Sequence, residues 1–353
     1  MKDKVRVGIV GSKFAADFHC DAYSRMDNAD VVAVAALDNL EQISGKYGIP
    51  ATYEDYNEMI EKENLDLVSI CAPNFLHHPI VLAASAAGVH SICEKPLAIS
   101  VEQAREMVEV SERNNTKLFY AEDWLHAPAL IRTEALLAEG AVGEILFVKA
   151  KEVHNGTHSP FAQNKETCGG GVFLHMGCHA VTWLLYILGQ DDNPVVEVTG
   201  KMTGGGEQNF IHKGNTGEDF GMGMMRFKKG QFAFAESNYI TQGGMDDKIE
   251  IYGTKGVIKV DLTFSSAVNC YSMNGIAYSI EKADINVGWT KPAVDEFYNL
   301  GYVTEMEYFV DCVIQDRQPK YGVDGRAGLA TVEIIQAFYE SNEKGKTIYG
   351  EWI

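Results

Sequence analysis

The chain has 353 residues, of which 46% are hydrophobic, so it can bury the cores of two domains or of one large one. Its formal net charge of −19 disfavours nucleic acid and anionic membrane surfaces as partners. No run of eighteen apolar residues predicts a membrane span, and the apolar run near the N-terminus is too short for a signal peptide. The seven cysteines are scattered and contain no CxxC pair, which indicates free thiols in a reducing compartment. We therefore expect a cytoplasmic protein.

Strand-like and helix-like segments alternate through roughly the first 120 residues, which predicts a doubly wound parallel sheet. The apolar run 5–10 resembles a buried strand, a glycine turn follows it, and residues 17–23 resemble a helix. This succession can bind a dinucleotide, with the pyrophosphate at the helix N-terminus. Gly11 and Ala16 fit the first and third positions of G-x-G-x-x-G/A, but Lys13 occupies the second. The candidate cofactor residues are Gly11, Ser12, Lys13, Phe14 and Ala15; a helix-packing turn without a ligand is the alternative.

The second strand, 31–36, leads to an acidic residue, Asp38. A carboxylate near this strand end can hold the adenosine ribose hydroxyls, which favours NAD. Position 37 is Leu, so no arginine stands there to bind the 2′-phosphate of NADP. Position 36 is Ala, however, which lacks the acidic side chain that would repel this phosphate, so NADP stays possible. Asp38 can also cap the helix that follows it.

Two further strand ends carry polar residues. The strand 65–71 runs into Ala72-Pro73-Asn74 and His77, in a loop expected before a helix at 80–87. The segment Glu94-Lys95-Pro96 follows the next buried-looking strand. A lysine amine in a cleft can bind a substrate hydroxyl and move a proton, whereas the alternative is a surface ion pair before a turn.

These motifs, in this order, resemble the glucose–fructose oxidoreductase, inositol dehydrogenase and MocA family. The resemblance extends to the C-terminus through Gly169-Gly170-Gly171, Gly177-x-His179 and the closing pattern Gly322-x-Asp324-Gly325-Arg326-Ala327. It therefore covers the whole chain, and the combination of motifs is specific although each motif alone is not.

The resemblance implies an N-terminal Rossmann domain and a C-terminal α/β domain with a large open mixed, mainly antiparallel sheet, and a nicotinamide between them. It implies that Lys95 is the catalytic lysine and that Glu94 lies at the cofactor ribose. Pro73, Asn74 and His77 match the loop beside the nicotinamide, and His179 matches the histidine of a D-x-x-x-H pair. The aspartate of that pair is replaced here by His175.

The remaining candidates lie in the second part of the chain, which we place at 124–353 after a dinucleotide-binding domain at 1–123. Trp124 and His126 begin the crossover between the domains and are candidate substrate contacts. The strand 145–154 ends in a loop rich in hydrogen-bonding groups, whose His154 and His158 favour a sugar-binding rim over core packing. Strand-like segments between 195 and 262 predict the mixed sheet, and its broad face predicts a homodimer or homotetramer.

A strongly apolar helix is predicted for 172–185, with His175 and His179 four residues apart on one face. The two histidines can serve as hydrogen-bonding and acid–base groups for a substrate hydroxyl, the interpretation we favour. They can also bind a divalent metal with His154 or His158. The third possibility is that both are structural.

The sequence thus predicts an NAD(P)-dependent oxidoreductase that acts on a ring hydroxyl of a sugar, glycoside or cyclitol, without a metal. The cofactor would supply the hydride chemistry, while the protein supplies geometry and charge. Two alternatives stay open. One is a glycoside-cleaving enzyme that uses transient oxidation at C3, and the other is a non-catalytic nucleotide- and sugar-binding regulatory protein.

Overall fold

The computed structural model describes residues 4–189, 192–283 and 286–352, which form two compact units. The first unit comprises the residues up to His126 together with Gly301–Leu329, and the second comprises Ala127–Leu300 with the residues from Ala330 onward. A single boundary after residue 123 would have assigned 301–329 to the second domain. These residues join the first unit because helix α11 (Tyr302–Ile314) packs against α1 (Phe14–Ser24), where the rings of Phe18 and Tyr302 lie 4.6 Å apart.

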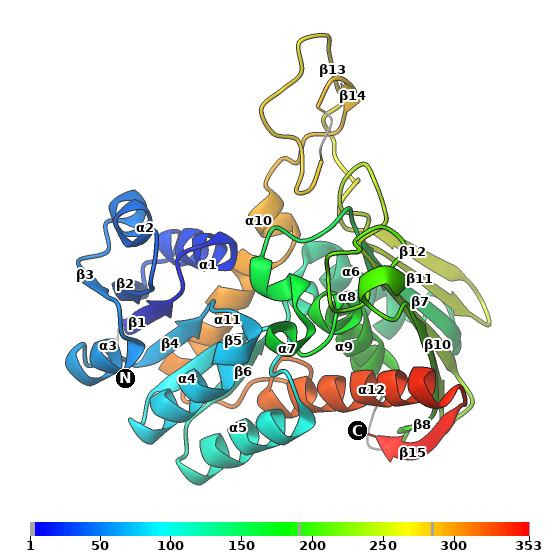
Figure 1. The fold of residues 1–353 in the computed structure, drawn as a ribbon, viewed down its shortest axis with the longest axis horizontal. Helices are drawn as coiled ribbons and strands as arrows, with labels where there is room; N and C mark the ends of the chain where they lie inside the picture. Colours follow the sequence, from blue (N-terminus) through cyan, green and yellow to red (C-terminus); the bar gives the residue numbers. More distant parts are fainter. Residues whose placement is uncertain (1–3, 190–191, 284–285, 353) are drawn as a thin grey trace. The chain divides into compact units, whose positions relative to one another are not determined.

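The first unit is built on a six-stranded parallel sheet in the order β3-β2-β1-β4-β5-β6 (Figure 1). This is the order of a doubly wound dinucleotide-binding fold, in which successive strands are added outward on one side of β1 and then, from β4 onward, on its other side. Its strands are β1 (Val5–Val10), β2 (Ala29–Ala35), β3 (Ala51–Tyr53), β4 (Leu67–Ile70), β5 (His90–Glu94) and β6 (Leu118–Ala121). Its further helices are α2 (Leu40–Tyr47), α3 (Tyr56–Lys62), α4 (Asn74–Ala86), α5 (Val101–Arg113) and η1 (Asp123–His126).

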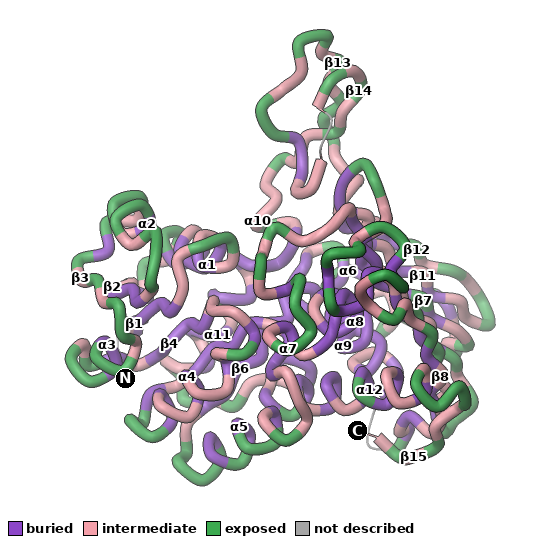
Figure 2. The backbone as a smooth tube through the Cα atoms, viewed as in Figure 1, coloured by how far each residue is buried: buried purple, intermediate pink, exposed green. Residues whose placement is uncertain are grey.

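Burial explains why these strands read as continuous apolar runs. Every residue of β4 and of the edge strand β6 is buried, as expected for a parallel sheet covered on both faces (Figure 2). Helix starts follow local capping: the side chain of Asp55 accepts from Asn57 N at α3, and that of Ser100 accepts from Gln103 N at α5. The predicted parallel sheet is confirmed.

The second unit is built on a seven-stranded mixed sheet in the order β12-β11-β7-β10-β9-β8-β15. Among the described strand pairs of this sheet only β7–β10 is parallel, so the predicted mixed, mainly antiparallel sheet is confirmed. The terminal strand β15 was not predicted. The strands are β7 (Ile145–Val153), β8 (Val195–Met202), β9 (Phe220–Phe227), β10 (Phe232–Asn238), β11 (Lys248–Gly253), β12 (Val257–Asp261) and β15 (Ile348–Trp352), and a small ribbon pairs β13 (Cys270–Ser272) with β14 (Gly288–Thr290).

Helices pack on one face of this mixed sheet (Figure 1). They include α8 (Val172–His175) and α9 (Gly177–Leu188), which contact β7, β9 and β10. The remaining helical segments are α6 (Pro128–Ala138), η2 (Pro160–Gln163), α7 (Lys165–Cys168), η3 (Gly206–Gln208), α10 (Glu296–Asn299) and α12 (Gly325–Lys344), and they are not all part of this layer. The first turn of α12 is grouped with the first unit and the rest with the second.

The continuous helix predicted for 172–185 is wrong, because the chain breaks at Met176, where φ is −115° and ψ is −43°. Met176 is buried in a cluster with Val172, Tyr239 and Met245. A Cβ on the next residue, Gly177, would lie 3.2 Å from both Phe173 and Ser237, so glycine lets α9 pack closely on β10. The helices before and after the break differ in direction by 51°.

The predicted start of α4 at residue 80 is also wrong, because this helix begins at Asn74. Pro79 lies in the second turn, where it removes one backbone donor without ending the helix. Among the described residues no single helix has the length and apolar composition to cross a bilayer. The bent pair Lys165–His175 and Gly177–Leu188 meets that test together, but most of α9 is buried in the core of its unit.

Candidate active site

The carboxyl ends of the parallel strands carry the residues predicted to bind the cofactor. Gly11 follows β1, Asp38 follows β2, Pro73 follows β4 and Lys95 follows β5. Ligands of open α/β sheets bind at this edge, near the point where the strand order reverses. Gly11 has a φ of +124°, and a Cβ there would lie 2.3 Å from the carbonyl oxygen of Cys71. Only glycine fits this tight turn.

The turn after β1 pairs with the end of β2. Lys13 Nζ lies 2.9 Å from Asp38 Oδ2, and Ser12 Oγ donates to Asp38 Oδ1 at 3.1 Å. The hydrogen bond from Lys13 lowers the pKa of Asp38. The alternative that Asp38 caps α2 is wrong, because Asn39 occupies the N-cap with a φ of 54° and makes no side-chain cap bond.

Phe14 and Ala15 form the first turn of α1. Phe14 is 48% exposed, and its ring lies 4.3 Å from that of Phe18. Helix α1 begins without a side-chain cap bond from its N-cap residue, Lys13. Its first backbone N–H groups can therefore serve an anion such as a pyrophosphate.

The carboxylate of Glu94 is buried and held from two sides. Its Oε1 lies 3.0 Å from His19 Nε2, and its Oε2 accepts from the backbone N of Lys95 at 3.1 Å. The other ring nitrogen of His19 lies 2.6 Å from Ser69 Oγ, which in turn lies 3.3 Å from Tyr23 Oη. Lys95 is half-buried and precedes Pro96 through a cis peptide bond. The network thus fixes the carboxylate beside Lys95.

His19 and Ser69 were missed by the sequence reasoning. His19 lies on the buried side of α1, between Phe18 and Cys20, which are also buried. A polar residue inside an apolar strand, as Ser69 is in β4, was the available signal, since buried polar groups require partners.

His77 is buried in α4, and not in a loop as predicted. Its Nδ1 lies 2.9 Å from the carbonyl oxygen of Pro96, and its Nε2 lies 2.9 Å from that of Ala72. Burial lowers its pKa, and a neutral ring can donate to only one of the two carbonyls. His77 therefore links the ends of β4 and β5. The neighbouring Asn74 is buried, and Pro73 is the N-cap residue of α4.

A fully buried acid, Glu305, lies in the first turn of α11. Neither of its carboxyl oxygens has a hydrogen-bond partner among the described residues. Burial, together with the charges of Asp123, Glu94 and Glu122, raises the pKa of Glu305 well above its usual range. The first unit therefore places a neutral acid near a group of carboxylates.

Trp124 and His126, predicted to contact the substrate, are buried in the first unit. The ring of His126 lies 5.1 Å from that of Tyr308 and 5.8 Å from that of Phe309. Burial, followed by the charge of Lys320, lowers the pKa of His126 to about 3. This environment is typical of a packed, neutral histidine, and a substrate contact for either residue stays a prediction.

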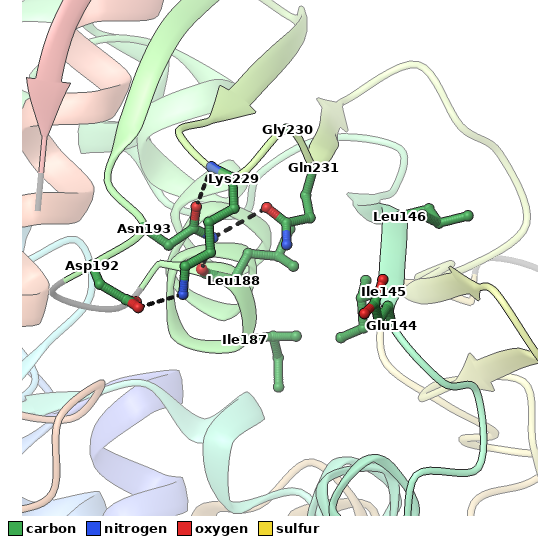
Figure 3. A pocket seen from close by; sticks show the side chains of 10 residues that line it. All are labelled: Glu144, Ile145, Leu146, Ile187, Leu188, Asp192, Asn193, Lys229, Gly230 and Gln231. Carbon is green, nitrogen blue, oxygen red and sulfur yellow. Dashed lines mark hydrogen bonds and ion pairs between the residues drawn. The ribbon is translucent and has the colours of Figure 1, made fainter.

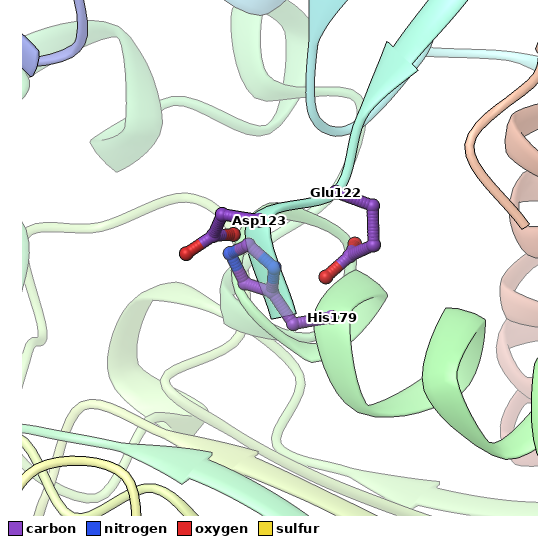
Figure 4. Close-up of side chains that lie close together, drawn as sticks. All are labelled: Glu122, Asp123 and His179. Carbon is purple, nitrogen blue, oxygen red and sulfur yellow. The ribbon is translucent and has the colours of Figure 1, made fainter. Parts of the chain in front are cut away.

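His175 and His179 do not share the face of one helix, because the break at Met176 separates them. His175 ends α8, is half-buried, and meets the ring of Phe161 edge-on at 5.5 Å. His179 is buried in the first turn of α9. Figure 4 shows His179 on its helix, and Glu122 and Asp123 where β6 leads into η1.

A carboxylate that the sequence reasoning missed lies beside His179. Oε2 of Glu152 is 3.7 Å from Nε2 of His179, and both side chains are buried. Glu152 follows Val148 and Ala150 on the core-facing side of β7. The signal was available in the sequence, because alternation in a strand places these three residues on the same face.

His154 and His158 differ in exposure. His154 is buried, its Nδ1 accepts from Gly156 N at 3.1 Å, and its ring lies 5.0 Å from Tyr239. His158 is exposed. Within the described ranges these two histidines do not join His175 and His179 in a set of three ligand atoms within 4.8 Å. The structure therefore does not assemble the metal site considered for them.

The second unit also contains a cavity of about 560 Å³ (Figure 3). Its polar groups satisfy one another: Asn193 Nδ2 donates to Leu188 O, Lys229 N donates to Asn193 Oδ1, and Lys229 Nζ pairs with Asp192. The lining residues are Glu144, Ile145, Leu146, Ile187, Leu188, Asp192, Asn193, Lys229, Gly230 and Gln231. None of these lining residues is one of the predicted site residues.

Both parts of the chain match models of one family of oxidoreductases. Residues 5–122 match the oxidoreductase family with an NAD-binding Rossmann fold, and residues 134–349 match the C-terminal alpha/beta domain of the same family. The chain is 25% identical to myo-inositol 2-dehydrogenase of Thermotoga maritima over 262 residues, 73% of this chain and 75% of that protein. It is 33% identical to D-glucoside 3-dehydrogenase of Escherichia coli over 193 residues, 52% and 54% of the two chains.

Solved structures share the fold over almost the whole length. The crystal structure of GenD2 from gentamicin A biosynthesis in complex with NAD has a TM-score of 0.90 and 24% identity, and covers 99% of this chain and 97% of that one. The structure of myo-inositol 2-dehydrogenase from Lactobacillus plantarum has a TM-score of 0.82 and 20% identity, with 98% and 99% covered.

Proposed function

The chain belongs to the glucose–fructose oxidoreductase, inositol dehydrogenase and MocA (Gfo/Idh/MocA) family of oxidoreductases, whose Rossmann domain binds NAD, and we propose that it transfers a hydride between the nicotinamide and a ring hydroxyl of a sugar, glycoside or cyclitol. The observation that carries the proposal is the buried Glu94 carboxylate beside Lys95 at the carboxyl end of β5. The dehydrogenase names of relatives that act on inositol and glucosides support the substrate class.

The first unit fits a nicotinamide dinucleotide. Gly11 leaves the space that a Cβ would fill, and the start of α1 offers backbone donors to a pyrophosphate. Asp38 is an acceptor for ribose hydroxyls, which favours NAD over NADP. When bound, the cofactor supplies the hydride chemistry that no side chain can provide.

The protein's own residues hold the reacting groups and move a proton. His19 and the Lys95 backbone fix the Glu94 carboxylate, so that it can accept from a ribose hydroxyl. The Lys95 amine donates to the reacting hydroxyl and stabilises an alkoxide. His179 takes up the proton as the hydroxyl carbon loses its hydride. His175 lies in the same unit as His179 and offers a further hydrogen-bonding group.

The open face of the mixed sheet supports a homo-oligomer. We define this face by its exposed apolar residues Met222, Met224 and Phe232 and by three ion pairs. The pairs join Lys149 to Glu250, Lys151 to Asp246 and Arg226 to Glu197. Because its charges are balanced, this face can pack against the same face of a second copy, although the chain as a whole carries a net charge of −19.

We also propose a cytoplasmic location, which the seven free thiols of the chain support.

The test is to incubate the purified protein with NAD or NADP and a panel of sugars, glycosides and inositols, following the absorbance of the reduced cofactor. Reduction with at least one member is expected, and Lys95→Ala should lower kcat by about 10²- to 10⁴-fold with cofactor binding retained. Lys62→Ala, at an exposed lysine of α3, is the control. No reduction with any member would refute the dehydrogenase, and glycoside cleavage without net reduction would favour the glycoside-cleaving alternative.

A further inference from the structure

We propose that Glu152 is a positioning residue for the reaction: its carboxylate orients His179 and stabilises the imidazolium that forms when His179 takes up the hydroxyl proton. The inference deepens the proposed function and rests on it. It assigns a role to a strand residue that no motif singled out.

Glu152 is fixed by the sheet. It lies on the core-facing side of β7, is 1% exposed, and is paired in register with Ser237 of β10. Ser237 Oγ donates to the carbonyl oxygen of Glu152 at 2.9 Å, so the backbone is held by its own neighbour. A carboxyl at this depth requires a polar or charged partner.

His179 is a polar partner of Glu152 in the structure. The residue is 3% exposed in the first turn of α9, the helix that packs on β7. The Nε2–Oε2 distance of 3.7 Å is longer than a hydrogen bond but within the range of an ion pair. Because the pair is buried, the attraction between the two charges is screened less than at a surface.

The proton balance gives the pair its function. In the oxidation direction the substrate O–H bond breaks, its proton moves to the ring nitrogen of His179 that does not face Glu152, and the carbon loses a hydride to the oxidised nicotinamide. The substrate becomes a carbonyl and the cofactor is reduced. A carboxylate beside the new imidazolium lowers the energy of this charge separation.

Geometry favours Glu152 over a residue on the helix itself. The family pattern expects an aspartate four residues before His179, but that position is His175, on the far side of the break at Met176. A carboxylate on β7 supplies the missing charge from a rigid strand. A purely structural ion pair is the rival interpretation, and the experiment separates the two.

The experiment compares Glu152→Gln, Glu152→Asp and the control Glu218→Gln. Glu218 is another buried acid of the second unit, held by Tyr339 Oη at 2.7 Å and by Phe173 N at 3.0 Å. We expect Glu152→Gln to lower kcat about 10- to 1000-fold while the KM for NAD changes less than 3-fold. Glu152→Asp should recover part of kcat, and Glu218→Gln should stay within 3-fold of wild type.

A second readout does not need turnover. The ring ¹⁵N chemical shifts of His179, assigned with His179→Gln, report its protonation and tautomer at fixed pH. They should change in Glu152→Gln and stay constant in Glu218→Gln. Unchanged shifts, an unchanged kcat, or an equal loss of kcat in the control would each overturn the role of Glu152. If wild type oxidises no substrate but the shifts respond as expected, the proposed function fails and the charge link between the two residues stands.

Discussion

Replacing His126 by Phe should make the protein less sensitive to acid. The ring of His126 packs against Tyr308 and Phe309, and burial lowers its pKa from 6.5 to about 3. Phe keeps an aromatic ring at this position, and the buried Nε2 of His126 has no hydrogen-bond partner among the described residues. At pH 8 the substitution should therefore change the free energy of unfolding by less than about 1.5 kcal/mol.

The sign of the pH effect follows from proton binding. Below pH 6.5 the unfolded chain binds a proton at His126 that the folded chain does not bind until the pH approaches 3. Folded stability is therefore complete above pH 6.5 and falls by about 1.4 kcal/mol per pH unit below it. Between pH 8 and pH 5 the wild type should lose about 2 kcal/mol more than His126→Phe.

Urea unfolding at pH 8, 6.5 and 5 measures this difference. Met273→Phe is the control, because Met273 is 81% exposed and carries no titratable group. Its pH dependence should follow that of the wild type. Parallel loss of stability in wild type and His126→Phe would refute the conclusion that His126 is buried as a neutral ring.

Three further substitutions test the structure. Glu305→Gln should gain stability relative to wild type as the pH rises from 5 to 8. Burial raises the pKa of Glu305, so the folded chain keeps a proton that the unfolded chain releases above about pH 4.3. Urea unfolding measures the difference, and a carboxylate that is ionised in the folded chain would give no pH trend between the two proteins in this range. Gly11→Ala should weaken NAD binding at least about tenfold, because the added Cβ would lie 2.3 Å from the carbonyl oxygen of Cys71 at a φ of +124°. Calorimetry measures the Kd for NAD, and an unchanged Kd would contradict the tight turn. Met224→Lys should shift the protein towards the monomer in light scattering, because Met224 is 46% exposed on the open sheet face. The control is Phe210→Lys, which should not change the mass, because Phe210 is 61% exposed but lies outside that face. Equal masses for both variants would exclude this face as the interface.

Local patterns were sufficient to predict most of the fold. The apolar runs that became β1 and β4 are continuous because both faces of a parallel sheet are covered, and the glycine turn after β1 follows from one backbone position. The alternation in β7 and β9 reflects one buried and one open face. These features depend on neighbours in sequence, so the sequence alone was enough to determine them.

Only the tertiary structure decided which side chains meet. The break at Met176 depends on the close packing of Gly177 against β10, which no helical period reveals. His19 and Glu94 lie 75 residues apart in the chain and 3.0 Å apart in space. The pairing of His179 with Glu152, and the return of 301–329 to the first unit, likewise depend on contacts between distant elements. A sequence pattern records which face a residue occupies, whereas the partner on that face is set by how the elements pack.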